Sequence, residues 1–300
     1  MITTNLELPY GHTALRAVLS TAEPPTFLDP PPAPAALDET TLLRQALACP
    51  EGCPPLHDLV RPGQKVVVIT SDLTRPCPSE RLLPPILDEL ALAGVPDGDV
   101  TVVVALGLHR AMTPEELQSA VGPEVYRRVR VINHDPTDIV RLGVTSAGTP
   151  VEVFRPVVEA DVRVCLGNLE LHYFAGFSGG AKAILPGCAS RATVTANHAM
   201  MVRREATAGR LEGNPVRADI EEGVALLGVD FCLNVVTDGA HHIVAAVAGE
   251  VTAAHRQGCA WVAERGITPL PQPVDIIVVS AGGNPKDVNL YQAQKALDNA

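Results

Sequence analysis

The sequence predicts an α/β protein: an N-terminal domain built on a mostly parallel sheet, plus the start of a second α/β domain that is apparently truncated. Two observations predict this class. Short β-branched runs recur along the chain, and stretches with apolar residues every three or four positions lie between them. Buried strands that alternate with helices are typical of a parallel sheet covered by helices on both faces.

The predicted elements follow one another in a regular order. A proline-rich connector at 23–36 precedes Asp38, a typical N-cap residue, and we expect a short helix from Thr41 onward. The predicted buried strands are KVVVIT (65–70), VTVVVALG (100–107), VRVIN (129–133), VRVCLG (162–167), FCLNVVT (231–237) and DIIVVSAGG (275–283). The predicted helices, which share an apolar spacing near 3.6, are 79–94, 188–204, 214–228 and 251–266.

A domain boundary is predicted in GITPLPQPVD (266–275), where prolines separate a finished helix from a new strand. We therefore expect an N-terminal cofactor-binding catalytic domain over 1–268 and the beginning of a C-terminal α/β domain over 269–300. This second unit would hold one strand and one helix, which cannot bury their own faces. The expectation is that the chain lacks further C-terminal sequence, or that its terminal unit packs on something else.

The composition excludes several classes of protein. With 46% hydrophobic and 19% charged residues, the chain is typical of an ordinary globular protein. A formal net charge of −11 and the absence of basic runs argue against a nucleic-acid partner. No signal peptide opens the chain, and no apolar run approaches the roughly 18 residues of a membrane span. The seven scattered cysteines predict reduced core thiols, so we expect a cytoplasmic protein without a membrane partner.

Polar and glycine residues follow nearly every predicted strand. Because ligands bind at the carboxyl ends of strands in a parallel sheet, these segments predict one shared crevice. The segments are SDLTRP (71–76), GLHR (107–110), NHD (133–135), GNLELHYFAGFSGGAK (167–182) and SAGGNPKD (280–287). The candidate residues that they contribute are Asp72, Arg75, His109, His134, His172 and Lys182.

Each candidate also has an ordinary structural explanation. The planar guanidinium of Arg75 suits a substrate carboxylate, although it could instead cap a turn or pair with Asp72. His109 fits a functional role and a solvated loop equally well, whereas His134 is better explained as a hydrogen-bonded structural histidine. His198 lies on a predicted helix, where a buried packing role is common. Residue types alone thus indicate an anion-binding α/β enzyme without defining its reaction.

The stretch HYFAGFSGGAKAILPG (172–187) combines a histidine, several glycines and a lysine. Its spacing nearly fits the phosphate-binding loop G-x-x-x-x-G-K-[ST], with Gly176 first and Lys182 as the lysine. However, Ala181 stands where the second glycine is required, and Ala183 replaces the hydroxyl that would bind magnesium. A nucleoside triphosphatase is therefore not predicted. We expect the glycines to let the backbone approach a different ligand.

Together, these segments resemble the nickel-dependent lactate racemase family. The resemblance rests on SDLTRP, LGLHR followed by MTPEEL, GNLELHYFAGFSGGAKAILPG, NH at 197–198 and NPKDVNLYQAQKAL, in the family's order. The family consists of 2-hydroxyacid racemases and epimerases that carry a nickel-pincer nucleotide, pyridinium-3-thioamide-5-thiocarboxylic acid mononucleotide with nickel. The resemblance implies a small, lactate-like 2-hydroxy acid as substrate. It also implies cofactor-biosynthesis enzymes as further partners.

The resemblance implies a role for each matching residue. Lys182 would hold the cofactor covalently as a thioamide, and His198 would bind the nickel. His109 and His172 match the family's acid/base pair. The remaining matches are Asp72, Gly179 and Gly180 at the cofactor, and Arg75, Tyr291, Gln292 and Lys295 at the substrate.

The implied reaction is a reversible hydride transfer from the substrate Cα to the cofactor, with one histidine as base and the other as acid. Two alternatives stay open. A cofactor-independent racemase would use His109 and His172 directly as two bases, and would exchange the Cα hydrogen with solvent. A non-catalytic nucleotide- or nickel-binding α/β protein would show no turnover. If its glycine loop held an ordinary phosphate, it would still bind ligand after Lys182→Arg.

Overall fold

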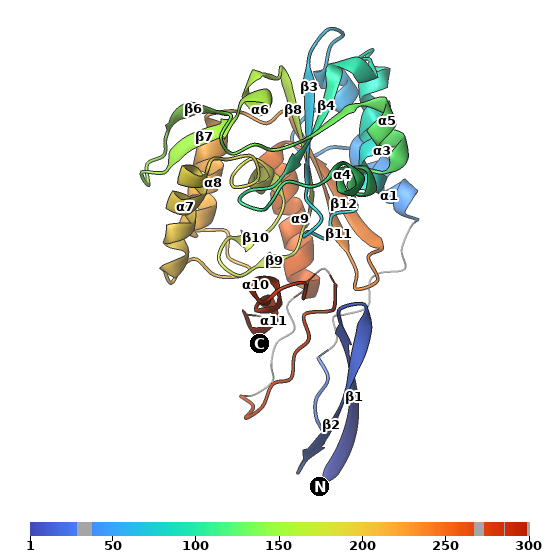
Figure 1. Ribbon diagram of the computed structural model, residues 1–300, viewed down its shortest axis with the longest axis vertical. Coiled ribbons are helices and arrows are strands. Elements are labelled where there is room, and N and C mark those ends of the chain that lie inside the picture. The colour runs from blue at the N-terminus through green and yellow to red at the C-terminus, as the bar shows by residue number, and fades with distance from the viewer. Residues whose placement is uncertain (29–37, 267–272, 285, 299–300) are drawn as a thin grey trace. The chain divides into compact units, whose positions relative to one another are not determined.

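The computed structural model describes residues 1–28, 38–266, 273–284 and 286–298 (Figure 1). The chain divides into two compact units. One unit comprises Ala33–Ala263 and contains the large sheet, and the other comprises Met1–Pro32 and Glu264–Ala300. The predicted domains, 1–268 and 269–300, stay a prediction.

The large unit is built on a six-stranded sheet, which confirms the predicted α/β class. The strand order is β12-β11-β8-β3-β4-β5. All neighbouring strands run parallel except β11 and β12, which pair antiparallel. The strands are β3 (Val66–Ser71), β4 (Val100–Ala105), β5 (Arg130–Asn133), β8 (Val162–Asn168), β11 (Phe231–Thr237) and β12 (Ile243–Gly249). The bounds of all these strands except β12 agree with those of the predicted runs to within one or two residues.

Alternation along the strands divides the core between the two faces of the sheet. In β3, Val66 and Val68 join one buried cluster, and Val67 and Ile69 join the other. The continuous valine run is therefore explained by burial on both faces. The first cluster includes side chains of α1 (Glu39–Ala48), α3 (Ser79–Leu92) and α5 (Pro123–Arg128), and the second those of α7 (Arg191–His198), α8 (Pro215–Ala225) and α9 (Val251–Gly266).

Polar caps define where the helices begin. Asp38 accepts a hydrogen bond from the backbone N–H of Thr41 at 3.0 Å, which confirms the predicted N-cap of α1. Ser190 caps α7, so the helix predicted from residue 188 begins at 191. It continues as the 3-10 turn η3 (Ala199–Val202). The remaining helices of this unit are α2 (Leu56–Leu59), α4 (Pro114–Val121) and α6 (Arg155–Glu159).

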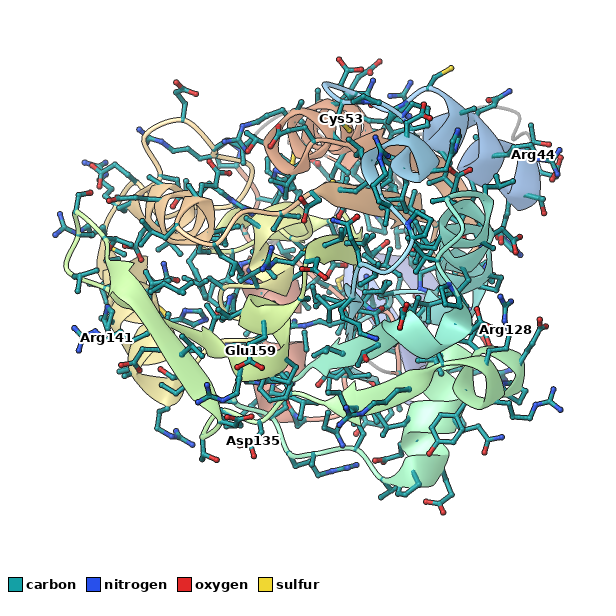
Figure 2. All side chains as sticks on the ribbon, turned by 90° about the horizontal axis from the view of Figure 1, so that it is seen from above. Arg44, Cys53, Arg128, Asp135, Arg141 and Glu159 are labelled. Carbon is teal, nitrogen blue, oxygen red and sulfur yellow. The ribbon has the colours of Figure 1, made fainter. Side chains whose placement is uncertain are left out.

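Two hairpins of the large unit are absent from the predicted elements. One pairs β6 (Ile139–Val144) with β7 (Pro150–Phe154), and the other pairs β9 (Leu171–His172) with β10 (Gly176–Phe177). In the view from above, Arg141 of β6 and Arg128 of α5 lie on opposite flanks of the unit (Figure 2).

The other unit contains a hairpin of β1 (Ile2–Tyr10) and β2 (Thr13–Thr21). At the hairpin turn, the carbonyl of Gly11 accepts a hydrogen bond from the backbone N–H of Asn284 at 2.9 Å. The strand predicted at 275–283 is wrong, because these described residues form no strand. No described segment supplies a partner strand beside them, and a lone strand leaves its backbone groups unpaired. The segment that follows forms only the short helices α10 (Leu290–Ala293) and α11 (Lys295–Asp298).

The sheet topology fixes where a ligand site is expected. From β3 the strand order grows outward through β4 and β5 on one side, and through β8 and β11 on the other. The order therefore reverses between β3 and β8, and α/β sheets bind ligands beyond the carboxyl ends of the strands at such a point. Within the residues described, no helix is long and apolar enough to cross a membrane.

Candidate functional site

Asp72 and His109 form a close pair at the carboxyl ends of β3 and β4. Oδ2 of Asp72 lies 2.6 Å from Nδ1 of His109, and Oδ1 accepts a hydrogen bond from the Thr74 hydroxyl at 2.8 Å. Burial alone would raise the pKa of Asp72. The hydrogen bonds from His109 and Thr74, together with the charge of Arg75, outweigh burial and lower that pKa. The ionised carboxylate is therefore held against the histidine ring.

This carboxylate determines which nitrogen of His109 carries hydrogen. An ionised carboxylate only accepts, so Nδ1 is the donor and the lone pair of the neutral ring lies on Nε2. The His109 side chain is 33% exposed. Its loop is fixed by a hydrogen bond from the backbone N–H of Gly107 to the carbonyl of Gly187 at 2.9 Å. His109 thus has the form of a general base at Nε2, backed by Asp72.

His172, in the hairpin that follows β8, has the opposite form. Its Nδ1 accepts a hydrogen bond from the backbone N–H of Ala175 at 3.3 Å. The neutral ring therefore carries its hydrogen on Nε2. Nε2 therefore carries the hydrogen in His172, whereas Nε2 carries the lone pair in His109.

The ring of Phe174 brings three of the predicted residues together. Its centroid lies 4.6 Å from the ring of His172 and 4.9 Å from that of His198, with edge-type geometry in both pairs. Nζ of Lys182 lies 5.6 Å from the same centroid, within the range of a cation–π contact. Phe174 is buried and was not among the predicted site residues.

His198, at the end of α7, is held neutral. Burial lowers the pKa of His198 to about 4, and the positive charges of Lys182 and Arg75 act in the same direction. Across the residues described, the guanidinium of Arg75 makes no hydrogen bond or ion pair. Arg75 therefore does not form the side-chain pair with Asp72 that the sequence left open, and its donors stay available to an anion.

A cavity of about 160 Å³ opens next to Asp72 and Arg75. It is lined by Ser71, Asp72, Leu73, Arg75, Cys77, Ser79, Glu116, Ser119 and Ala120. The available arginine therefore stands in a partly polar hollow rather than on a flat surface.

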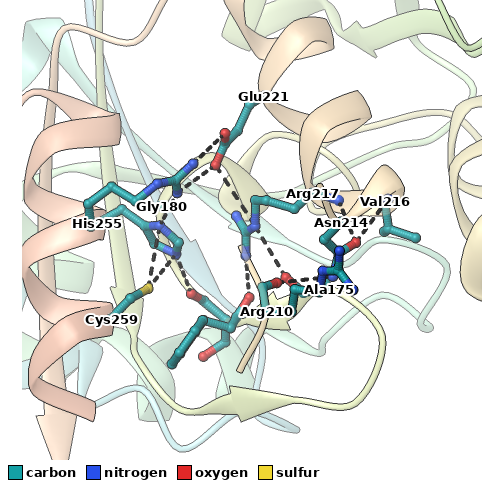
Figure 3. Close-up of polar contacts among 12 residues, drawn as sticks. Ala175, Gly180, Arg210, Asn214, Val216, Arg217, Glu221, His255 and Cys259 are labelled. Atoms are coloured by element: carbon teal, nitrogen blue, oxygen red, sulfur yellow. Dashed lines mark hydrogen bonds and ion pairs between the residues drawn. The ribbon is translucent and has the colours of Figure 1, made fainter. Parts of the chain in front are cut away.

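Buried Arg217 holds the loop that connects Phe174 to Lys182 (Figure 3). Its Nε donates to the carbonyl of Ala175 at 3.2 Å, and its Nη2 donates to the carbonyl of Phe177. Burial lowers the pKa of Arg217 to about 10, which leaves the guanidinium charged at neutral pH. The arginine thus donates to two loop carbonyls, of which that of Ala175 also accepts the backbone N–H of Phe177 at 3.0 Å.

His255 and Asn234 hold the next turn of the same loop. Nε2 of His255 lies 2.9 Å from the carbonyl of Ser178, and Oδ1 of Asn234 accepts the backbone N–H of Gly180 at 3.1 Å. Burial lowers the pKa of His255 to about 3, so its ring is neutral. Lys182 follows directly, in the 3-10 turn η2 (Gly180–Ala183).

The glycines of this loop are required by neighbouring protein atoms. Gly179 and Gly180 have φ of +71° and +58°. A Cβ at Gly179 would lie 2.7 Å from Oδ1 of Asn234, and one at Gly180 would lie 2.7 Å from Cδ2 of His255. Protein atoms therefore fill the space on the Cβ side of both glycines, and the expectation that these glycines let the backbone approach a ligand stays a prediction. Their role as cofactor contacts stays a prediction.

The described residues offer few ligands for a metal bound here. In the part of the chain that the structure describes, no group of three or more His, Cys, Asp or Glu side chains could hold a metal ion. The site offers the neutral imidazole of His198, and imidazole suits nickel. Lys182 offers an amine at the same aromatic ring, that of Phe174. These residues fit a metal-carrying group that brings most of its own ligands.

Four sequence-predicted residues remain. Tyr291, Gln292 and Lys295 belong to the smaller unit, with their backbones in α10 and α11. Their side chains lie outside the described residues, so their roles stay predictions. His134 is buried against Phe154 in the large unit, but neither ring nitrogen has a partner in the described residues. The expectation that His134 is hydrogen-bonded through its ring is therefore wrong.

A family model and two curated relatives match most of the chain. A family model described as the lactate racemase N-terminal domain matches residues 10–209. The lactate racemase of Thermoanaerobacterium thermosaccharolyticum is 36% identical over 300 residues, which cover 98% of this chain and 70% of that protein. The lactate racemase of Lactiplantibacillus plantarum is 35% identical over 269 residues, covering 88% of this chain and 63% of that protein. The chain thus spans about two thirds of the length of these relatives.

Solved structures give the same result for the fold. The structure of the lactate racemase apoprotein from Thermoanaerobacterium thermosaccharolyticum matches 97% of this chain and 70% of that one, with a TM-score of 0.87 and 36% identity. A crystal structure of a Thermotoga maritima protein matches 81% of this chain and 63% of that one, with a TM-score of 0.66 and 22% identity. The second match supports the fold alone.

Proposed function

The chain belongs to the lactate racemase family, and from this premise we propose that it is a racemase or epimerase of a small, lactate-like 2-hydroxy acid. The observation that carries the proposal is the meeting of His172, Lys182 and His198 at the ring of Phe174. Arg75 connects this group to the Asp72–His109 pair, since its charge acts on both His198 and Asp72. Acid/base groups, an attachment point and an anion-binding group therefore lie within one unit.

The proposed cofactor is the nickel-pincer nucleotide, attached as a thioamide at Lys182, with His198 as the protein ligand to nickel. When bound, this cofactor accepts and returns the hydride of the substrate Cα. His198 supports the assignment because it is neutral at the pH of the cell and has one ring nitrogen to offer a metal. Asp72, Gly179 and Gly180 are proposed to contact the nucleotide.

Arg75 is proposed to bind the substrate carboxylate, for which its planar fork is suited. Tyr291, Gln292 and Lys295 are proposed to complete substrate binding. The hydroxyl proton of the substrate moves to Nε2 of His109, and Asp72 stabilises the imidazolium that forms. This arrangement supports His109 as the base, because its Nε2 already carries the lone pair in the described structure.

His172 would serve as the partner acid/base group. In the described state its Nδ1 accepts the Ala175 backbone N–H, so the hydrogen of the neutral ring lies on Nε2. To take a proton at Nε2, the ring must carry its hydrogen on Nδ1, and this requires release of the Ala175 backbone N–H. The two histidines are therefore proposed to act in turn, with His172 changing its hydrogen-bond partner as it does so.

The test uses lactate labelled with deuterium at Cα and protein produced together with the cofactor-biosynthesis enzymes. Hydride transfer keeps the deuterium in the opposite enantiomer, whereas direct proton abstraction replaces it with solvent hydrogen. Lys182→Ala is expected to abolish turnover. Loss of the label, or turnover that survives Lys182→Ala, would favour the cofactor-independent two-base racemase. A loaded protein without turnover on a panel of 2-hydroxy acids would favour a non-catalytic binding protein.

A further inference from the structure

A chain of buried polar groups leads from α8 to His198. The side-chain amide of Asn197 donates from Nδ2 to Oδ2 of Asp219 at 2.8 Å and to the carbonyl of Val216 at 3.2 Å. Asn197 and Asp219 are both only 2% exposed. The carboxylate of Asp219 also accepts hydrogen bonds from the hydroxyls of Thr145 and Thr149. The amide of Asn197 is therefore held on one side by groups that are themselves fixed.

These partners decide which way the amide faces. A backbone carbonyl only accepts hydrogen bonds, so the end of the Asn197 amide that faces Val216 must be the NH₂ group. The other end is then Oδ1, which lies 3.1 Å from Nδ1 of His198. An amide oxygen also only accepts, so Nδ1 of His198 must carry the hydrogen of this contact. The lone pair of the neutral ring is left on Nε2.

We propose that Asn197 is a positioning residue that fixes His198 in its Nδ1–H form and leaves Nε2 as the nitrogen that binds a metal. The metal part of this inference rests on the proposed function, whereas the hydrogen position concerns this chain alone. Metal-binding histidines usually donate their other ring N–H to a fixed acceptor. Here the fixed acceptor is the neighbouring residue on the same helix.

Packing restricts the ring in a second way. The ring of Phe174 meets that of His198 at 68°, with centroids 4.9 Å apart. A turn of the imidazole that removed Nδ1 from Asn197 would have to pass this aromatic neighbour, which is itself buried. The hydrogen bond and the aromatic contact therefore favour the same ring orientation.

The first test needs neither cofactor nor activity. In ¹⁵N-labelled protein without cofactor at pH 8, long-range ¹H–¹⁵N spectra are expected to show a pyrrole-type Nδ1 and a pyridine-type Nε2 for His198. His198→Gln assigns the signals by removing them. Asn197→Ala removes the acceptor and is expected to shift the ring toward the Nε2–H form. Thr149→Val is the matched control, since it removes a hydroxyl from the same carboxylate without touching His198, and it should keep the wild-type pattern.

The second test follows nickel in protein loaded with cofactor. Loss of the acceptor beside a metal-binding histidine typically weakens metal affinity by about 10–100-fold. Asn197→Ala is therefore expected to lose nickel to a chelator that much more readily than the wild type, and Thr149→Val is expected to retain it. Equal retention by Asn197→Ala and Thr149→Val would contradict the positioning role.

The outcomes separate this inference from the proposed function. A wild-type His198 in the Nε2–H form overturns the inference, even if Asn197→Ala does not fold. An Asn197→Ala variant that keeps the Nδ1–H form overturns it as well. A wild-type His198 in the Nδ1–H form, in a chain that never takes up nickel, supports the inference about the hydrogen and contradicts the proposed cofactor.

Discussion

Replacing Gly180 by alanine tests whether the loop before Lys182 rests on His255. The backbone of Gly180 has φ of +58°, and an added Cβ would lie 2.7 Å from Cδ2 and 2.8 Å from Cγ of the His255 ring. The left-handed conformation costs a non-glycine residue about 1–2 kcal/mol. Overpacking against a buried side chain adds about 1–3 kcal/mol. We therefore expect Gly180→Ala to lower the free energy of unfolding by about 2–5 kcal/mol.

The matched control is Gly148→Ala. Gly148 also has a positive φ, +89°, but a Cβ there would meet no atom within 4 Å. This control should lose only the conformational part, about 1–2 kcal/mol. Combining Gly180→Ala with His255→Ala removes the ring that the new methyl group meets, so the pair should cost less than the sum of its single variants.

The assay is urea unfolding followed by the fluorescence of Trp261, the single tryptophan of the chain. Trp261 lies on α9, the helix that carries His255, so its signal reports on the same region. Equal losses of stability in Gly180→Ala and Gly148→Ala would refute the contact between the loop and His255. Strict additivity in the double variant would refute it independently.

Three further substitutions test the large unit. Burial lowers the pKa of His134 from 6.5 to about 4. As the pH falls below 6.5, His134 takes up a proton in the unfolded chain but not yet in the folded chain, so the free energy of unfolding of the wild type decreases. His134→Leu has no group to protonate there, so urea unfolding should show its free energy of unfolding rising by about 2 kcal/mol relative to the wild type between pH 8 and pH 5. A difference between the two proteins that stays the same at both pH values would contradict this. Arg217→Leu removes the side-chain donor of the Phe177 carbonyl, whereas the Ala175 carbonyl keeps the backbone N–H of Phe177. The variant should therefore lose about 1–3 kcal/mol of unfolding free energy in the same assay, and an unchanged free energy of unfolding would refute this dependence. Asp72→Asn should lower turnover per loaded protein by about 10²–10⁴-fold, and unchanged kcat would contradict the role of Asp72 in supporting His109 as the base.

The strands of the large sheet could be predicted because burial on both faces requires continuous β-branched residues, as in β3. The β6–β7 hairpin could not be predicted from the sequence, because a register shift between Arg141 and Gly143 interrupts the alternation of buried and exposed residues that marks a half-buried strand. The apolar run at 275–283 has the composition of a buried strand. Composition does not reveal whether a partner strand exists, and the described residues there form none.

Part of the candidate site could be predicted because parallel topology brings the ends of neighbouring strands together. The rule predicted Asp72 and His109 in one crevice, whereas their direct contact was not predicted. Phe174 and Arg217 gave no comparable signal, since an aromatic residue and an arginine occur in many structural roles. The contact between Asn197 and Asp219 joins residues 22 positions apart on different helices, and only the tertiary packing reveals it.

The glycine–lysine stretch (172–187) shows a close approach whose partner on the Cβ side the sequence could not identify. Its glycines do mark a loop whose backbone lies close to another group. That group is the buried protein scaffold of Asn234 and His255. Sequence spacing indicates that close approach occurs but does not identify what is approached.

The most direct test of the proposed function is the intact mass of the chain, produced together with the cofactor-biosynthesis enzymes and compared with Lys182→Ala. We expect a nickel-containing adduct on the wild type and none on the variant. The lactate racemase of Thermoanaerobacterium thermosaccharolyticum, produced in the same cells, serves as the loading control. An unmodified wild-type chain alongside a loaded control, or an adduct that persists in Lys182→Ala, would contradict the attachment of the cofactor at Lys182.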